Sequence, residues 1–234
     1  MDFLQQSAFM WIRDGVLINR MHVNPVAFAA AYWLLLSEQN RKSIDIEALI
    51  NFGFEKSGFS CAEKMRLFNE EKADLLEDVS AAADLYNDVA GGAGAKCGYF
   101  DFAPELLNKL SGDGCKNFIT SALDQKILDD WSTTEQGLKI KDSLTEMLGK
   151  RDGFSKGYDH FKYVSSQVKG GRIFYVADAI SEIAIASKYA TEFNITKIGF
   201  AYHINADAVE QAYQFVSSLH ELPLLDKSRL TLPE

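Results

Sequence analysis

The sequence lacks the features that mark membrane, secreted and metal-cluster proteins. No segment reaches the roughly 18 consecutive apolar residues that a membrane-spanning helix needs. The N-terminal MDFLQQS has no basic region before an apolar signal core. The three cysteines have no CxxC or Cys/His metal spacing, so we interpret them as buried free thiols in a reducing compartment. We therefore expect a soluble, cytoplasmic protein that does not bind a membrane.

Positive charge is also scarce. The chain has 24 Lys and Arg residues against 33 Asp and Glu, a net charge of −9. This charge repels nucleic acids and anionic membranes, and no local basic patch compensates for it. Apolar residues make up 47% of the 234 positions, enough for a sizeable core. The composition predicts a globular protein whose partner is a small molecule or another protein, without nucleic-acid binding.

The most informative stretch is AFMWIRDGVLIN, residues 8–19. The apolar run from Phe9 to Ile12 is typical of a buried strand, and Asp14 with Gly15 interrupts it. In an open parallel sheet, ligands bind at the carboxyl ends of the strands. This strand therefore predicts a carboxylate, Asp14, at a ligand-binding edge.

A long section without a strand pattern follows, from residue 20 to about residue 90. Asn24 and Pro25 are typical of a helix start, and Ser60 with Glu63 forms a capping-box pattern. The glycines of residues 91–94 predict a hinge in a linker that returns to the first domain. The predicted helices cover residues 25–40, 45–54, 60–68 and 73–89.

Strands and helices alternate after Pro104, with strands predicted at residues 117–120, 172–177 and 197–202. Such alternation predicts a doubly wound parallel α/β sheet with a Rossmann-like core. We expect residues 1–19 and 100–234 to form this core and residues 20–99 to form an inserted all-helical cap over the strand ends. Helices are predicted at residues 104–110, 123–131, 134–148, 155–168, 180–193, 208–216 and 218–225.

Three further groups of polar residues lie near predicted strand ends. Thr120 and Ser121 follow a short strand, although a hydroxyl there is also a common helix cap. Lys156 lies at a helix start, although a single lysine is usually a solvated surface residue, and we interpret His160 as structural. Asp178 and Glu182 follow the strand of residues 173–177, where two carboxylates suit Mg²⁺ and where Asp178 could also cap a helix.

The order of these motifs around a helical insert resembles the haloacid dehalogenase-like hydrolases, which are phosphatase-like. The resemblance implies that Asp14 is an acid and base in catalysis and that Lys156 neutralises the phosphate and the nucleophile. It further implies a small phosphorylated molecule as ligand, bound by Thr120, Ser121 and Lys156. The implied metal is Mg²⁺. Its ligands would be Asp14, Asp178 and Glu182.

One position departs from the resembled pattern. The family has a nucleophilic aspartate where this sequence has Ile12, which has no nucleophilic atom and cannot bind a metal. The substitution predicts that covalent phosphoryl transfer is blocked and that Mg²⁺ binding is weakened. Two function classes remain open: a phosphatase-like hydrolase with lost or strongly reduced activity, and a non-catalytic module that binds a phosphometabolite or a protein.

Overall fold

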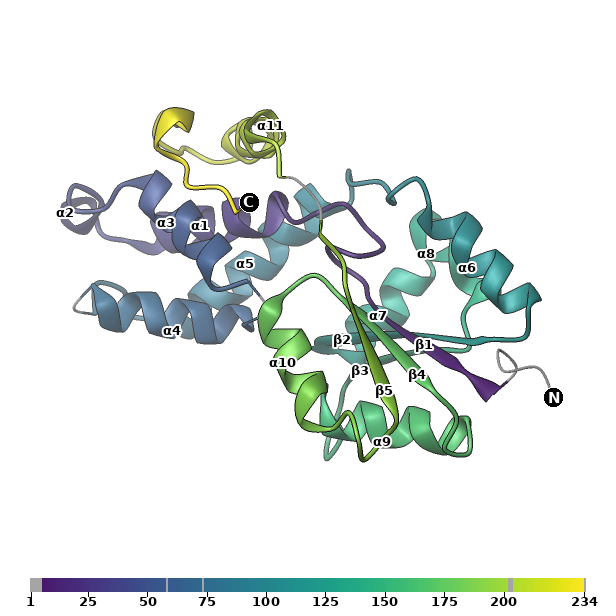
Figure 1. Cartoon of the computed structure of the whole chain (residues 1–234). Coiled ribbons are helices and arrows are strands. Elements are labelled where there is room, and N and C mark those ends of the chain that lie inside the picture. Colours follow the sequence, from purple (N-terminus) through teal and green to yellow (C-terminus); the bar gives the residue numbers. More distant parts are fainter. Residues whose placement is uncertain (1–5, 58, 73, 202–203, 234) are drawn as a thin grey trace. The chain divides into compact units, whose positions relative to one another are not determined.

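The computed structural model describes residues 6–57, 59–72, 74–201 and 204–233 (Figure 1). The chain divides into two compact units. The α/β unit comprises residues 1–19 and 98–201, and the helical unit comprises residues 20–97 and 202–234.

The α/β unit is built on a five-stranded parallel sheet. Its strands are β1 (Ala8–Ile12), β2 (Lys116–Asp124), β3 (Glu146–Lys150), β4 (Ile173–Ala177) and β5 (Ile195–Gly199). Their spatial order is β3-β2-β1-β4-β5, and every neighbouring pair is parallel. The chain order reverses between β1 and β4, which makes their carboxyl ends the switch point where such sheets bind ligands. This sheet confirms the predicted fold class.

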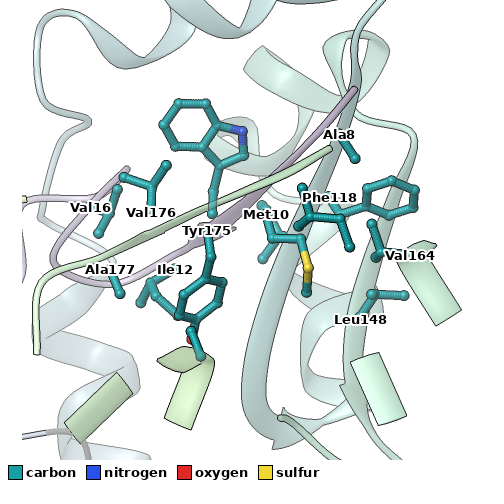
Figure 2. Packing of buried hydrophobic residues seen from close by; sticks show 14 of the residues in the cluster. Ala8, Met10, Ile12, Val16, Phe118, Leu148, Val164, Tyr175, Val176 and Ala177 are labelled. Carbon is teal, nitrogen blue, oxygen red and sulfur yellow. The ribbon is translucent and has the colours of Figure 1, made fainter. Parts of the chain in front are cut away.

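Helices cover both faces of the sheet, with α6 and α8 on one side and α9 and α10 on the other (Figure 1). On the α9 side, alternate residues of the strands form the core, such as Met10, Phe118 and Tyr175, against Phe161 and Val164 of α9 (Figure 2). The helices are α6 (Ala103–Gly112), α7 (Gln125–Ser132), α8 (Glu135–Ile140), the 3₁₀ helix η2 (Lys141–Ser143), α9 (Tyr158–Gln167) and α10 (Ile180–Lys188).

The strand β3 differs from the sequence prediction, which had a helix over residues 134–148. The helix α8 ends at Ile140, η2 follows it, and Glu146–Lys150 then pair with β2 as an edge strand. Leu148 is fully buried there. At Gly149 a Cβ atom would lie 2.7 Å from the Cα atom of Gln125, so the close approach of α7 requires glycine. Contacts with β2 and α7, rather than the local sequence pattern, determine that these residues form a strand.

The described part of the helical unit contains helices and no strand. Four aromatic residues form its centre, with Phe68 at 4.9 Å from both Tyr32 and Phe52 between ring centroids and with Phe28 beside them. The helices are α1 (Val23–Leu35), α2 (Glu38–Arg41), α3 (Ile46–Glu55), α4 (Cys61–Glu71), α5 (Val79–Gly94), α11 (Ala206–Ser217) and the 3₁₀ helix η3 (Lys227–Arg229).

The C-terminal segment belongs to the helical unit, whereas the sequence placed residues 100–234 in the core. The helix α11 contacts α1 and α5 and buries Val209, Tyr213 and Val216. After it, the backbone N–H of Asp226 donates to Glu47 at 2.7 Å. The apolar stripe of α11 is therefore buried by helices far away in the sequence, which its own pattern could not indicate.

The glycines predicted to form a hinge lie inside α5 instead. Gly94 packs against Arg20, and a Cβ atom at this position would lie 2.5 Å from the guanidinium carbon. Arg20 Nη2 donates to the carbonyl of Ala90 at 2.8 Å. At Gly94 the glycine thus serves close packing. None of the described helices is both long and apolar enough to cross a membrane.

Candidate functional site at the carboxyl ends of the strands

Ile12 is the last residue of β1, where the resemblance described above predicts a nucleophile. It pairs in register with Thr120 of β2 and is only 7% exposed. Figure 2 shows its side chain in the packed layer that also contains Met10, Tyr175 and Ala177. The end of β1 therefore contributes an apolar side chain to the core and no ligand to the site.

Arg13 and Asp14 form a two-pronged ion pair directly after β1. Arg13 Nε lies 2.9 Å from Asp14 Oδ1, and Nη2 lies 3.0 Å from Oδ2. The Arg13 side chain is 5% exposed and that of Asp14 is 24% exposed. The guanidinium also lies over the Trp131 ring, at 5.2 Å from its centroid. Both oxygens of the predicted acid and base are thus hydrogen-bonded to a buried cation.

A tight turn fixes this pair. Gly15 has φ of 93°, a conformation that favours glycine, and its N–H donates to the carbonyl of Ile18 at 2.9 Å. The N–H of Ile18 donates in return to the carbonyl of Arg13 at 2.9 Å. The Asp-Gly pair in the sequence therefore shapes the backbone as well as supplying a carboxylate.

Within β2, level with the end of β1, Thr120 is engaged by His160 of α9. Thr120 Oγ1 lies 2.8 Å from His160 Nδ1, and His160 Nε2 lies 3.3 Å from the carbonyl oxygen of Gly149. Burial lowers the pKa of His160 to about 4, so the ring is neutral at pH 7. Because the carbonyl can only accept, we assign the ring hydrogen to Nε2. Thr120 then donates its hydrogen to Nδ1 and not to a ligand.

Ser121, the next residue of β2, is the other predicted phosphate-binding hydroxyl, and it is half-buried. Its Oγ accepts a hydrogen bond from the N–H of Leu123 at 3.2 Å. A hydroxyl that accepts in this way retains its own hydrogen for donation. Ser121 therefore suits an anion better than its neighbour Thr120 does.

Lys156 and Glu182 form a second ion pair, near the end of β4. Lys156 Nζ lies 2.5 Å from Glu182 Oε1, and their side chains are 16% and 9% exposed. The hydroxyl of Tyr175, inside β4, donates to Glu182 Oε2 at 2.6 Å. Burial first, and then the Glu182 charge, raise the pKa of Tyr175, so it remains a donor at neutral pH. Both oxygens of Glu182 are engaged.

Asp178 follows β4 and is half-buried. Burial raises the pKa of its carboxyl to about 6. Its own backbone N–H and the charge of Lys156 act against this shift, while the charges of Glu182 and Asp14 add to it. Asp14, Lys156 and Glu182 therefore lie close enough to Asp178 for their charges to affect it. Thr120 instead faces His160.

The implied Mg²⁺ does not fit the side chains as they lie. Among the described residues, no three His, Cys, Asp or Glu side chains gather as metal ligands. The predicted ligands Asp14 and Glu182 each give both oxygens to hydrogen bonds with Arg13, or with Lys156 and Tyr175. Asp178, the third predicted ligand, takes part in none of these hydrogen bonds. The role of Mg²⁺ stays a prediction.

Three residues of this site were missed in the sequence. Arg13 carries a signal, since it is a single charge between an apolar strand and Asp14. Tyr175 and Trp131 carry none, because aromatic residues in a strand or a helix usually belong to the core. Their roles arise from contacts with residues that sequence spacing does not relate to them.

The structure resembles those of known proteins, although the sequence does not. Neither a known protein-family profile nor a curated protein matches the sequence. A predicted phosphoglycolate phosphatase from Haemophilus somnus 129pt matches with a TM-score of 0.63 at 14% identity, over 86% of this chain and 87% of that one. A hydrolase from Pseudomonas syringae gives 0.61 at 17%, over 88% and 90%.

A third structure carries the family's name. It is a HAD-superfamily hydrolase of subfamily IA, variant 1, from Geobacter sulfurreducens PCA, with a TM-score of 0.50 at 14% identity, over 82% of this chain and 86% of that one. This chain has the haloacid dehalogenase-like fold. The predicted resemblance to this superfamily is thereby confirmed at the level of fold. The fold does not fix the reaction.

Proposed function

We propose that this phosphatase-like protein binds a small phosphorylated molecule at the ends of β1, β2 and β4 and hydrolyses it very slowly or not at all. The observation that carries the proposal is the end of β1. Ile12 is buried in the core there, and Arg13 engages both oxygens of Asp14. The fold is that of phosphatases, while the groups that would attack phosphorus are absent or engaged.

Covalent phosphoryl transfer needs a nucleophile at the end of β1. The aliphatic side chain of Ile12 has no lone pair with which to attack phosphorus. Direct attack by water would need a base close to the phosphate. Asp14 is the only predicted candidate, and its pairing with Arg13 stabilises the carboxylate and makes it a poor proton acceptor. Hydrolysis by water is therefore expected to be slow.

Anion binding remains chemically reasonable. Lys156 is partly accessible, and a phosphate dianion can compete with Glu182 for its ammonium group because charge-assisted bonds to phosphate are strong. Ser121 can donate its hydroxyl hydrogen to the same ligand. We therefore assign phosphate contact to Lys156 and Ser121, with Thr120 in a supporting role through His160.

The test compares the wild type with Ile12→Asp and with the matched control Ile12→Asn, which has the same shape as aspartate without its charge. Phosphate release from a panel of phosphate esters is measured with Mg²⁺, and binding of the same esters is measured by calorimetry. We expect ester binding without release in the wild type, and we expect any release to be confined to Ile12→Asp. Asp14→Asn, introduced into the wild type and into Ile12→Asp, should abolish any phosphate release.

Two outcomes would contradict the proposal. Rapid release by the wild type would show that another group attacks phosphorus. Absence of ester binding in every variant would favour the alternative, a module that binds a protein. For such a partner, the exposed apolar side chain to test first is Ile180, which begins α10 and is 88% exposed.

A further inference from the structure

Asp178 lies close enough to Asp14 and Glu182 to be affected by their charges, so these three carboxylates form a loose cluster of like charge near the ends of β1 and β4. Like charges that are partly buried repel one another strongly and need positive charge nearby. The chain itself supplies two cations to this cluster, Arg13 and Lys156. The charge balance of the cluster is thus met largely by side chains.

The contacts of the two cations are specific. Arg13 reaches one oxygen of Asp14 at 2.9 Å and the other at 3.0 Å, in the planar fork geometry that arginine forms with carboxylates. Lys156 reaches one oxygen of Glu182 at 2.5 Å, and Tyr175 reaches the other at 2.6 Å. Mg²⁺ requires near-octahedral oxygen ligands at about 2.0–2.1 Å, so it would have to displace these donors.

Displacement of Arg13 is costly because this side chain has little access to water. It is 5% exposed and lies over Trp131. Separation would take the buried guanidinium away from its carboxylate partner, and the guanidinium would also repel an incoming dication. The burial of Arg13 therefore disfavours metal entry more than its contact with Asp14 does alone.

We infer that Arg13, with Lys156, is a permanent counter-charge in place of a divalent metal ion, so that the strand-end site is complete without metal. The inference goes beyond the proposed function and does not depend on it. Binding of Mg²⁺ can be measured without any phosphate ester, and ester binding can be measured in the presence of a chelator. Failure of one is therefore distinguishable from failure of the other.

The experiment titrates the wild type, Arg13→Met and Arg13→Lys with Mg²⁺, followed by calorimetry and by the thermal unfolding midpoint. Methionine keeps much of the buried chain length without the charge, and lysine is the matched control that keeps the charge. In the wild type we expect no saturable binding and no change in the midpoint between Mg²⁺ and chelator. In Arg13→Met we expect binding at least about tenfold tighter, with Arg13→Lys like the wild type.

Trp131 provides a second readout that needs no folded Arg13 variant. A metal that displaces Arg13 would change the fluorescence of Trp131, and Trp131→Phe identifies this signal among the other tryptophans. A constant signal in the wild type supports the inference. Saturable Mg²⁺ binding by the wild type would overturn it, and so would a folded Arg13→Met protein that binds Mg²⁺ no better than Arg13→Lys.

Discussion

The ends of β1 and β4 neutralise a carboxylate in two different ways. At β1 the cation and the acid are chain neighbours, Arg13 and Asp14, fixed by a tight turn. At β4 the cation comes from 26 residues earlier in the chain, since Lys156 precedes α9 and Glu182 lies in α10. The β4 end also has a second acid, Asp178, whose pKa is raised chiefly by burial.

This difference indicates where chemistry remains available. The β1 end has an apolar residue and an acid engaged on both oxygens, so it has little capacity to bind or to transfer a proton. The β4 end has Asp178, which changes its protonation near pH 6, and Lys156, which is partly accessible. We expect ligand contacts to depend mainly on the β4 end. Four predictions test this comparison.

The largest expected effect follows from removing the shared acceptor of the β4 end. Glu182→Ala removes the ion-pair partner of Lys156 and the acceptor of the buried Tyr175 hydroxyl, so the free energy of unfolding should fall by about 3–5 kcal/mol. Urea unfolding measures this. Glu182→Gln, which keeps an acceptor, should lose less, and a loss below about 1 kcal/mol for the alanine variant would show that the ion pair is not important for stability.

Acid should weaken the fold through His160, the partner of Thr120. Its pKa is lowered to about 4 in the folded protein, so protons bind preferentially to the unfolded chain. The contribution of His160 to the free energy of unfolding is therefore fully present above the ordinary histidine pKa of about 6.5. It is lost as the pH decreases to about 4, by roughly 3 kcal/mol.

Protonation of Asp178 stabilises the folded protein over the same pH range, which would mask the effect of His160. The measurement is therefore made in an Asp178→Asn background. Unfolding is followed at several pH values in that background, with and without His160→Gln. The loss between pH 6.5 and 4 should be smaller in the double variant. An unchanged slope would mean that other groups cause the acid sensitivity.

Asp178→Asn itself should stabilise the protein at pH 8. The pKa of Asp178 is raised to about 6 in the folded state, so its ionised form costs stability above that pH, by roughly 1–3 kcal/mol. The gain from asparagine should disappear as the pH falls from 6 to 4, where the native carboxyl becomes protonated. Asp14→Asn, which removes the partner of Arg13, should destabilise instead, and this contrast sharpens the comparison of the two ends.

The smallest expected effect concerns Tyr175. Tyr175→Phe removes one hydrogen bond to Glu182 and leaves Lys156 in place, so unfolding should become easier by about 1 kcal/mol. Thermal or urea unfolding at pH 7 measures the change. If Tyr175→Phe lowers the free energy of unfolding as much as Glu182→Ala does, Tyr175 and not Lys156 is the main partner of Glu182. The comparison of two ion pairs would then be wrong.

Several elements were predictable because their signals are local. The apolar run of β1, the Asp-Gly turn and the alternation after Pro104 indicated the parallel sheet that the structure contains. The strand β3 was missed because its five residues, EMLGK, have no clear period and are held by pairing with β2. The helix α11 was assigned to the wrong unit because an amphipathic pattern shows that a face is buried and not which surface buries it.

The sequence by itself determined which side chains the predicted site has: Ile12 at the end of β1, together with Asp14, Thr120, Lys156, Asp178 and Glu182. Only the tertiary structure decided how these groups are used. Arg13 pairs with Asp14, His160 accepts from Thr120, and Lys156 pairs with Glu182. The physical reason is that hydrogen bonds and ion pairs depend on distances of about 3 Å between atoms. Sequence order specifies such distances only where a turn fixes neighbouring residues.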